Sequence, residues 1–192
     1  MAILGSNYLQ TNYIAPSSFA QNGGIIQTVC KDITTQVAQP IYANTHTTVS
    51  NTAALIYPKR QTSSILIYVR WCFEVTSLYT CNFGLLQEAF YGGVDLRNTQ
   101  IGLPPYLSAQ LPGITCGMDT YSANAANDQS TPAQMNFWYR DTVPSGVQSL
   151  TYRPTVMPST NRTLYLNRTI LNSNTTAFEL LTSAIYLFEV SG

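Results

Sequence analysis

One segment of the chain, Ile65–Val75, restricts the possible folds more than any other. Every second residue in this segment is large and apolar, and successive side chains of a β-strand point to opposite faces. The face expected to lie in a core carries Ile65, Ile67, Val69, Trp71, Phe73 and Val75. The opposite face carries Tyr68, Arg70, Cys72 and Glu74. We expect this second face to meet solvent or a neighbouring subunit.

Further strand patterns recur at short intervals with turn residues between them, which is typical of an all-β sandwich or barrel. The predicted strands are Ile25–Ile33, Tyr79–Leu86, Met135–Arg140, Val147–Val156, Thr163–Ile170 and Ser183–Val190, with a weaker candidate at Ile114–Tyr121. The best helical stretch, Leu85–Phe90, is only about one and a half turns long. Proline is excluded from the middle of a paired ladder, so Pro154 predicts an end, a bend or a sheet edge.

Two regions differ from this pattern. Residues 92–131 are rich in Gly, Pro, Asn and Ser, and we expect one or two short strands there and an exposed loop over 122–130. Residues 1–22 are polar with isolated apolar residues and no regular spacing. The chain is therefore predicted to hold an extended N-terminal arm, residues 1–22, and one β-sandwich domain, residues 23–192.

The charge content indicates which partners to expect. The 192 residues include nine basic and nine acidic residues, 9% of the chain is charged against 45% hydrophobic, and a typical domain has about 25% charged residues. Scattered Lys and Arg argue against nucleic acid, since phosphate affinity needs clustered cations. No apolar run approaches the ~20 residues that span a bilayer. A neutral surface rich in Tyr and Asn indicates packing against further protein subunits.

Catalytic and metal-binding patterns are missing from the sequence. His46 is the single histidine, and a catalytic triad also needs a nucleophile and an orienting carboxylate. The cysteines form no CxxC pair of the kind that holds zinc. They are Cys30, Cys72, Cys81 and Cys116. We expect no enzymatic activity, no cofactor and no metal.

Two of the cysteines are predicted to be neighbours. A hairpin turning at Thr76-Ser77 would place Cys72 opposite Cys81, with Cα atoms about 4.5–5.5 Å apart, within disulfide range. Residues 1–13 have neither a charged start nor a sustained apolar stretch, so we expect no signal peptide. Synthesis in the cytoplasm favours thiols, and adjacency without a bond is the expectation.

Two residues near the predicted strand Met135–Arg140 are candidates for special roles. Asp141, ahead of Thr142-Val143-Pro144, could be a binding residue. We favour a structural role, in which its carboxylate accepts bonds from backbone N–H groups and fixes the turn. Trp138 has the opposite parity to Phe137 and Tyr139. It is therefore a possible subunit contact.

Motifs in a fixed order along residues 23–191 resemble a module found at the C-termini of phage tail-fibre and virion-surface proteins. The matching segments are Gly24–Val29, Tyr57-Pro58-Lys59, Thr62–Ile67, Tyr139–Pro144, Ser149–Tyr152, Leu164–Thr169 and Thr182–Val190. The resemblance implies a jelly-roll-like antiparallel β-sandwich with an extended N-terminal arm. It also implies a homotrimer on the outside of a virion made in the host cytoplasm.

Two virion roles fit this resemblance. A capsid decoration (cement) protein would sit as a trimer on the major capsid protein, or on other virion subunits, and tie them together with its arm. A receptor-binding tail-fibre tip would instead recognise a host surface glycan or protein through its loops. The module begins only 22 residues after Met1, too few for a fibre shaft, so we place decoration first. The expected anchoring residues are Leu4, Tyr8, Leu9, Tyr13 and Ile14.

Overall fold

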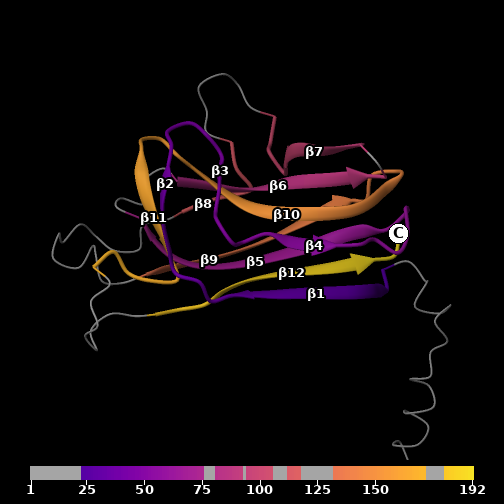
Figure 1. Ribbon diagram of the computed structural model, residues 1–192, viewed down its shortest axis with the longest axis horizontal. Coiled ribbons are helices and arrows are strands. Elements are labelled where there is room, and N and C mark those ends of the chain that lie inside the picture. The colour runs from indigo at the N-terminus through magenta and orange to yellow at the C-terminus, as the bar shows by residue number, and fades with distance from the viewer. Residues whose placement is uncertain (1–22, 76–80, 93, 106–111, 118–131, 172–179) are drawn as a thin grey trace, which may run out of the picture.

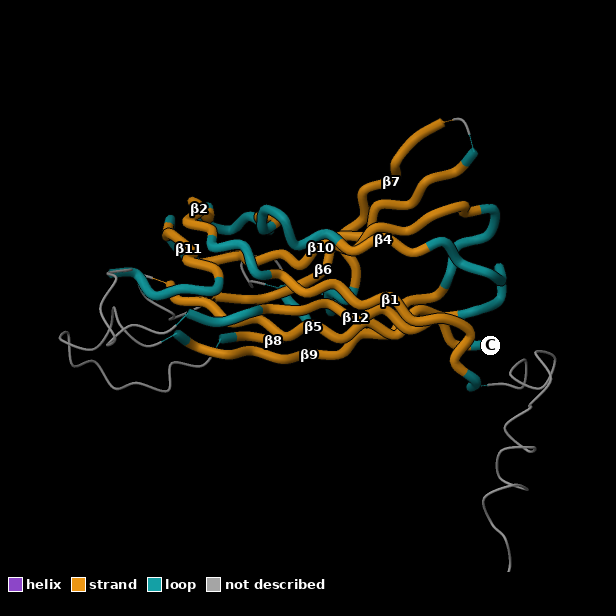
Figure 2. The backbone as a smooth tube through the Cα atoms, turned by 60° about the horizontal axis from the view of Figure 1, so that its bottom comes forward, coloured by secondary structure: helices purple, strands orange, loops and turns teal. Residues whose placement is uncertain are grey.

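The computed structural model describes residues 23–75, 81–92, 94–105, 112–117, 132–171 and 180–192. Within these ranges all regular structure is β, in two antiparallel sheets that lie face to face (Figures 1 and 2). The predicted antiparallel β-sandwich is therefore confirmed. The same ranges contain no helix long and apolar enough to cross a membrane. The predicted arm, residues 1–22 with all five anchoring residues, lies outside the described residues.

The first sheet, sheet A, is built around the long central strand β5. Its strands are β1 (Ile25–Ile33), β2 (Val37–Ile41), β5 (Ser64–Val75), β9 (Ala133–Thr142), β11 (Arg162–Leu166) and β12 (Ser183–Val190). On one side, the first part of β5 pairs with β12 and the last part pairs with β11. Strand β12 pairs in turn with β1, and β11 pairs with β2. On its other side β5 pairs with β9. In the half formed by β1, β12, β5 and β9, the outermost strands are therefore β1 and β9.

The second sheet, sheet B, is built around β10 and β6. Its strands are β3 (Thr47–Thr48), β4 (Ala54–Ile56), β6 (Cys81–Tyr91), β7 (Val94–Ile101), β8 (Thr115–Cys116) and β10 (Val147–Pro158). Strand β10 pairs with β6 along its whole length, and β6 then pairs with β7 and β8. The region 92–131 thus holds the eight-residue β7 and the short β8, while the predicted loop 122–130 lies outside the described residues.

The core lies between the sheets and is centred on β5. The alternating set Ile65, Ile67, Val69, Trp71, Phe73 and Val75 is buried. From sheet B, Phe83 packs against the rings of Trp71 and Phe73, with centroid distances of 5.6 Å and 5.2 Å. Interlocked rings of this kind add about 0.5–1.5 kcal/mol per pair to the burial of their area.

The hairpin predicted between Cys72 and Cys81 is wrong. Cys72 lies on β5 in sheet A, at the level of Gln134 on β9, whereas Cys81 lies on β6 in sheet B, at the level of Pro158. The chain crosses from one sheet to the other between these strands, so the cysteines are not cross-strand neighbours. All four cysteines are free thiols. The stretch Leu85–Phe90 is part of β6 and not helical.

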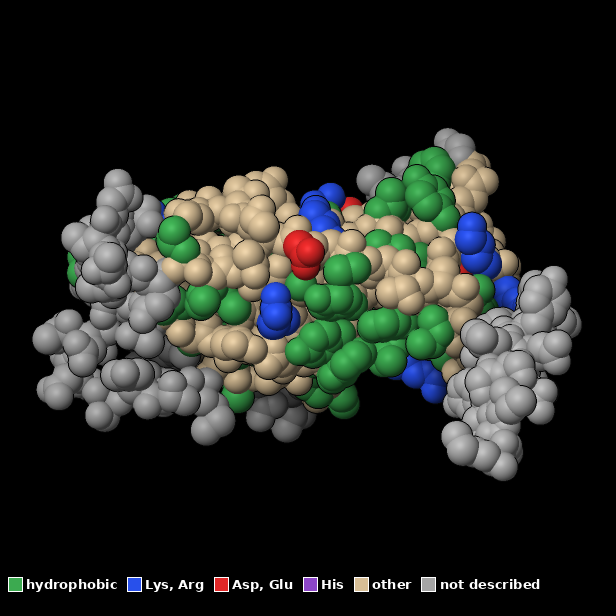
Figure 3. Space-filling view, turned by 90° about the horizontal axis from the view of Figure 1, so that it is seen from below, with side chains coloured by type: hydrophobic (Ala, Val, Ile, Leu, Met, Phe, Trp, Pro, Cys, Tyr) green, Lys and Arg blue, Asp and Glu red, His purple; other side chains and the backbone are tan. Residues whose placement is uncertain are grey.

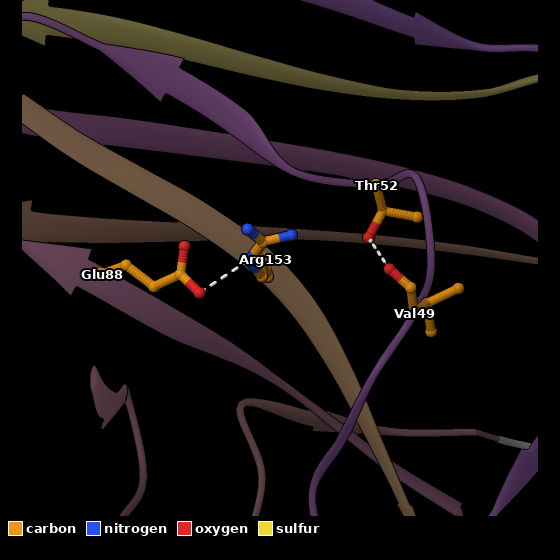
Figure 4. A network of polar contacts seen from close by, with 4 residues as sticks. All are labelled: Val49, Thr52, Glu88 and Arg153. Carbon is orange, nitrogen blue, oxygen red and sulfur yellow. Dashed lines mark hydrogen bonds and ion pairs between the residues drawn. The ribbon is translucent and has the colours of Figure 1, made fainter. Parts of the chain in front are cut away.

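Pro154 lies within β10 and does not end the strand. Its carbonyl accepts a bond from the Val49 N–H, and the N–H and C=O of a strand residue point to the same side. Its missing N–H therefore faces the gap between β3 and β4, where the connecting turn is closed by a 2.7 Å bond from the Thr52 hydroxyl to the Val49 carbonyl (Figure 4). The proline removes no ladder bond at this position.

Two carboxylates, one buried and one half-buried, tie separate parts of the fold together. Glu189, fully buried on β12, accepts bonds from Gln27, Lys59, Arg60 and Ser63. Burial alone disfavours its charged form, but these bonds outweigh burial and hold the pKa of Glu189 below its usual value. The loop that precedes β5 is thereby fixed to β12.

The second carboxylate is that of Asp141, on β9. It accepts a bond from the backbone of Thr142, in line with the expected turn role, and also bonds from Gln87 and Tyr152 in sheet B. The bond from the Tyr152 hydroxyl is 2.7 Å long. Burial raises the pKa of Asp141, against the effect of these bonds. Asp141 thus connects the two sheets through the interior.

Candidate interaction surface

The outer side of sheet A carries aromatic side chains at matching levels of neighbouring strands. The strand register places Tyr186 of β12, Tyr68 of β5 and Trp138 of β9 side by side, and one step along it places Phe188 beside Leu66. Adjacent strands are about 4.8 Å apart, so the side chains on one level touch. We call this surface the aromatic face and define it as Leu66, Tyr68, Trp138, Tyr186 and Phe188.

The rings of the aromatic face contact one another. Tyr68 stacks on Trp138 with ring centroids 4.4 Å apart and planes 29° apart. Phe188 lies 6.1 Å from Trp138 and 6.5 Å from Tyr186, the latter nearly parallel at 11°. Such mutual contacts restrict the rotamers, so the surface is largely ordered before any partner arrives. Preorganised side chains lose less entropy on binding.

The aromatic face remains open to solvent within the chain. Trp138 is 53% exposed, and Leu66, Tyr68, Tyr186 and Phe188 are partly exposed. Figure 3 shows apolar side chains gathered in a band on this side of the molecule, with isolated charged side chains beside it. Contiguous exposed apolar patches of this kind mark sites of protein–protein contact. The predicted subunit-contact residue Trp138 belongs to the aromatic face, where its ring contacts those of Tyr68 and Phe188.

Charges of opposite sign lie toward opposite edges of this surface. Asp32 is exposed on β1, and Arg140 is exposed on β9. Arg140 donates to the Ser64 hydroxyl at 3.2 Å, and Arg70 lies between the two edges on β5 and donates to the Thr182 carbonyl. An aromatic centre with a polar border is the usual composition of a protein interface.

The outer side of sheet B differs in chemistry. Arg153 of β10 forms an ion pair with Glu88 of β6 at 2.8 Å (Figure 4). These two charges satisfy each other within the chain.

His46, Thr155 and Gln100 form a chain of hydrogen bonds on the sheet B side. The Pro112 carbonyl can only accept, so His46 Nε2 donates to it at 3.0 Å, and Nδ1 accepts from the Thr155 hydroxyl at 3.0 Å. Gln100 in turn donates to Thr155 at 2.7 Å. Burial lowers the pKa of His46, despite the bond to Pro112. The histidine is thus a neutral structural residue, and the described ranges contain no cluster of ligands suited to a metal ion.

A groove opens at one end of the aromatic face. It has a volume of about 480 Å³ and is lined by Gly23, Leu66, Arg140, Val190, Ser191 and Gly192. Leu66 belongs to both the groove and the aromatic face, so the two are continuous. The size lies within the range of about 300–1,000 Å³ typical of ligand pockets. Gly23 is also the first described residue of the chain.

Sequence reasoning anticipated part of this site. The parity of Ile65–Val75 placed Tyr68 on the outer side, and the parity of Trp138 separated it from the core. The same parity was wrong for Cys72 and Glu74, which are buried instead of meeting solvent or a neighbouring subunit. Tyr186 and Phe188 were not singled out, although they alternate with Ile185 and Leu187, which are buried. That alternation is the signal that would have found them. The groove depends on the meeting of β5, β9 and β12, which no local pattern encodes.

The molecule is an antiparallel β-sandwich with an exposed aromatic surface on one sheet. No family model matches the chain, and no curated protein matches it. Among solved structures, infectious bursal disease virus of the Gx strain is similar over 88% of this chain and 39% of that chain, with 15% identity and a TM-score of 0.35.

Two further structures from infectious bursal disease virus are similar to the same degree. The crystal structure of its VP2 subviral particle matches 87% of this chain and 38% of that chain, with 14% identity and a TM-score of 0.34. The structure of T=1 particles of a mutant VP2 protein matches 88% of this chain and 38% of that chain, with 15% identity and a TM-score of 0.36. The chain spans less than two fifths of the length of each of these viral chains.

Proposed function

We propose that this chain is a non-catalytic structural protein of a phage particle. Three copies associate through the aromatic face and form a decoration (cement) unit on the capsid surface. The resemblance of the motifs to those of phage virion-surface proteins supports the setting, and the aromatic face is the single observation that carries the role. It is built for contact with another protein surface.

The size of the aromatic face suits the centre of such a contact. The four strands β1, β12, β5 and β9 span about 14 Å, and the six-residue distance from Ala184 to Val190 adds about 20 Å along the strands. This part of sheet A has roughly 300 Å² of sheet surface before the side chains are counted, and the aromatic face lies within it. A stable interface buries about 800 Å² per partner, with an apolar centre and a polar rim. The aromatic face supplies the centre, and its border supplies part of the rim.

The charge distribution favours other copies of the chain as partners. With Asp32 toward one edge and Arg140 toward the other, the β1 edge of one copy complements the β9 edge of the next. A contact between two different edges is heterologous, and heterologous contacts close into rings when the rotation permits. A ring of three agrees with the trimer that the motif resemblance implies.

The test is the number and position of the copies on purified particles of the virus that encodes the chain. Quantitative mass spectrometry against the major capsid protein, with antibody labelling in electron microscopy, gives both. The proposal predicts many copies spread over the shell. A few copies confined to the tail would favour the receptor-binding tail-fibre role instead, and absence from the particle would overturn both roles.

A further inference from the structure

The groove at the end of the aromatic face starts where the described chain starts. Gly23, one of its lining residues, donates its backbone N–H to the Ser191 carbonyl at 3.0 Å, and Ser191 donates back to Gly24 at 2.9 Å. These bonds fix Gly23 to the C-terminal end of β12, beside Val190 and Gly192. The 22 residues that precede Gly23 therefore leave the sandwich at the lip of the groove.

The backbone of Gly23 allows the chain to change direction at this point. Its φ is +91°, in the left-handed region that L-residues with a Cβ rarely adopt. Strand β1 begins only two residues later, at Ile25. A left-handed residue just before a strand lets the preceding segment turn away from the strand axis. The preceding residues can then run over the outer side of sheet A.

The composition of the segment before Gly23 matches the groove. Residues 1–22 contain no Asp, Glu, Lys, Arg or His, so no side-chain charge would have to be desolvated in a groove lined by Leu66, Val190 and two glycines. Phe19 is the large apolar residue nearest to Gly23, with only Ala20, Gln21 and Asn22 between them. Four extended residues reach about 13 Å, and Leu66 on β5 is two strands, about 10 Å, from β1.

We propose that the groove binds the base of the chain's own N-terminal arm, residues 16–22, with Phe19 as the side chain that fills it. The covalent link gives this segment an effective concentration in the millimolar range, which a separate partner would have to exceed. Ser17, Ser18 and Ala20 are small and let the backbone lie close to Val190 and Leu66. Arg140 at the rim can donate to backbone carbonyls of the bound segment.

This inference rests on the proposed function, because it assigns the groove the task of directing the arm that anchors the protein. With residues 16–22 held, the anchoring residues Leu4 to Ile14 leave the sandwich from one fixed point. The 15 residues before Pro16 still reach about 50 Å when extended. The arm is then aimed at a neighbouring surface instead of sampling all directions.

Hydrogen exchange of the full-length protein, read out by mass spectrometry on peptides covering residues 16–22, tests the proposal. Amides of this segment should exchange at least about tenfold more slowly in the wild type than in Val190→Glu, which places a charge in the groove. Phe19→Asp should remove the same protection from the arm side. Asn136→Glu is the matched control, since Asn136 is exposed on β9 and does not line the groove.

Each outcome decides the matter. Protection lost in both Val190→Glu and Phe19→Asp but kept in Asn136→Glu supports the proposal. Unprotected amides in the wild type, or protection that neither substitution changes, would overturn it. Protection that disappears on dilution would assign the groove to the arm of another copy and also overturn it. Arg140→Glu provides a second groove variant, and circular dichroism verifies the fold of each.

The result is separable from the proposed function. Protection of residues 16–22 in a chain that is absent from virus particles would keep the groove assignment and remove the decoration role. Unprotected residues in a chain that covers the capsid would do the reverse.

Discussion

The substitution Glu189→Gln tests whether a single buried carboxylate holds the loop ahead of β5 in place. Both carboxylate oxygens lie 2.9 Å from the Lys59 N–H, Oε1 also accepts from Arg60 at 3.0 Å and from Ser63 at 2.6 Å, and Oε2 accepts from Gln27 at 2.6 Å. Glutamine keeps the volume and one carbonyl oxygen. Its amide nitrogen, however, faces one or more of the same donors.

The structure also limits how Gln27 can adapt. Its amide nitrogen donates to the Tyr57 carbonyl at 2.7 Å as well as to Glu189, so a flipped Gln27 would set two carbonyl oxygens against each other. About two bonds to the charged group are therefore lost, each contributing about 1.5–3 kcal/mol. We expect Glu189→Gln to lower the free energy of unfolding by about 3–6 kcal/mol.

Urea unfolding at one fixed protein concentration measures this loss. The matched control is Glu88→Gln, which removes a carboxylate with a single ion-pair partner, Arg153, whose side chain is 37% exposed. Water can solvate Arg153 in this variant, so the cost should be smaller than that of Glu189→Gln. A cost for Glu189→Gln no larger than that of Glu88→Gln would refute the reasoning.

The difference in stability between the wild type and Glu189→Gln should also depend on pH. The pKa of Glu189 is lower in the folded chain than its usual value near 4.5. A lowered carboxyl pKa stabilises the fold above the unfolded-state pKa, and this stabilisation is lost as the pH falls toward the folded pKa. The difference between wild type and Glu189→Gln should therefore be full at neutral pH and shrink below about pH 4.5.

Three further predictions concern the core, the histidine and the arm. Trp71→Ala should cost about 3–5 kcal/mol in urea unfolding, because Trp71 is fully buried against Phe73 and Phe83, and an unchanged midpoint would contradict this packing. His46 has a lowered pKa, so its contribution to stability is lost as the pH falls below about 6.5; His46→Gln should flatten the stability profile between about pH 7 and 5, and an equally steep profile would assign the dependence to other groups. Deletion of residues 1–22 should leave native circular dichroism but abolish binding to virus particles, and full retention on the capsid would contradict the anchoring role of the arm.

Alternation along single strands made a large part of the fold predictable. The apolar parity of Ile65–Val75 gave the core face, and β1 and β12 have the predicted bounds. The same rule applied to β12 predicts that Ile185, Leu187 and Glu189 face the interior. A charged residue at a position whose neighbours of the same parity are apolar is the sequence signal for the buried carboxylate of Glu189.

Other features were beyond reach because they depend on tertiary context. Strand β7 (VDLRNTQI) has few apolar residues and therefore no clear strand pattern. It forms because it pairs with β6, and this tertiary context outweighs its own low propensity. Cys72 and Cys81 are close in sequence, but the crossing between sheets that separates them has no local signature. Pro154 is tolerated within β10 only because β3 and β4 leave a gap beside it. The groove needs residues of three strands together with Gly23 and the C-terminal residues Ser191 and Gly192 to form.

Sedimentation equilibrium of the full-length protein at micromolar concentration tests whether copies of this chain associate through the aromatic face. We expect a mass of three times 21.2 kDa for the wild type and 21.2 kDa for Trp138→Asp. Tyr42→Asp should remain a trimer, because Tyr42 is 55% exposed and lies outside the aromatic face. A wild-type mass of 21.2 kDa, or a trimer that persists in Trp138→Asp, would show that the aromatic face does not join the copies.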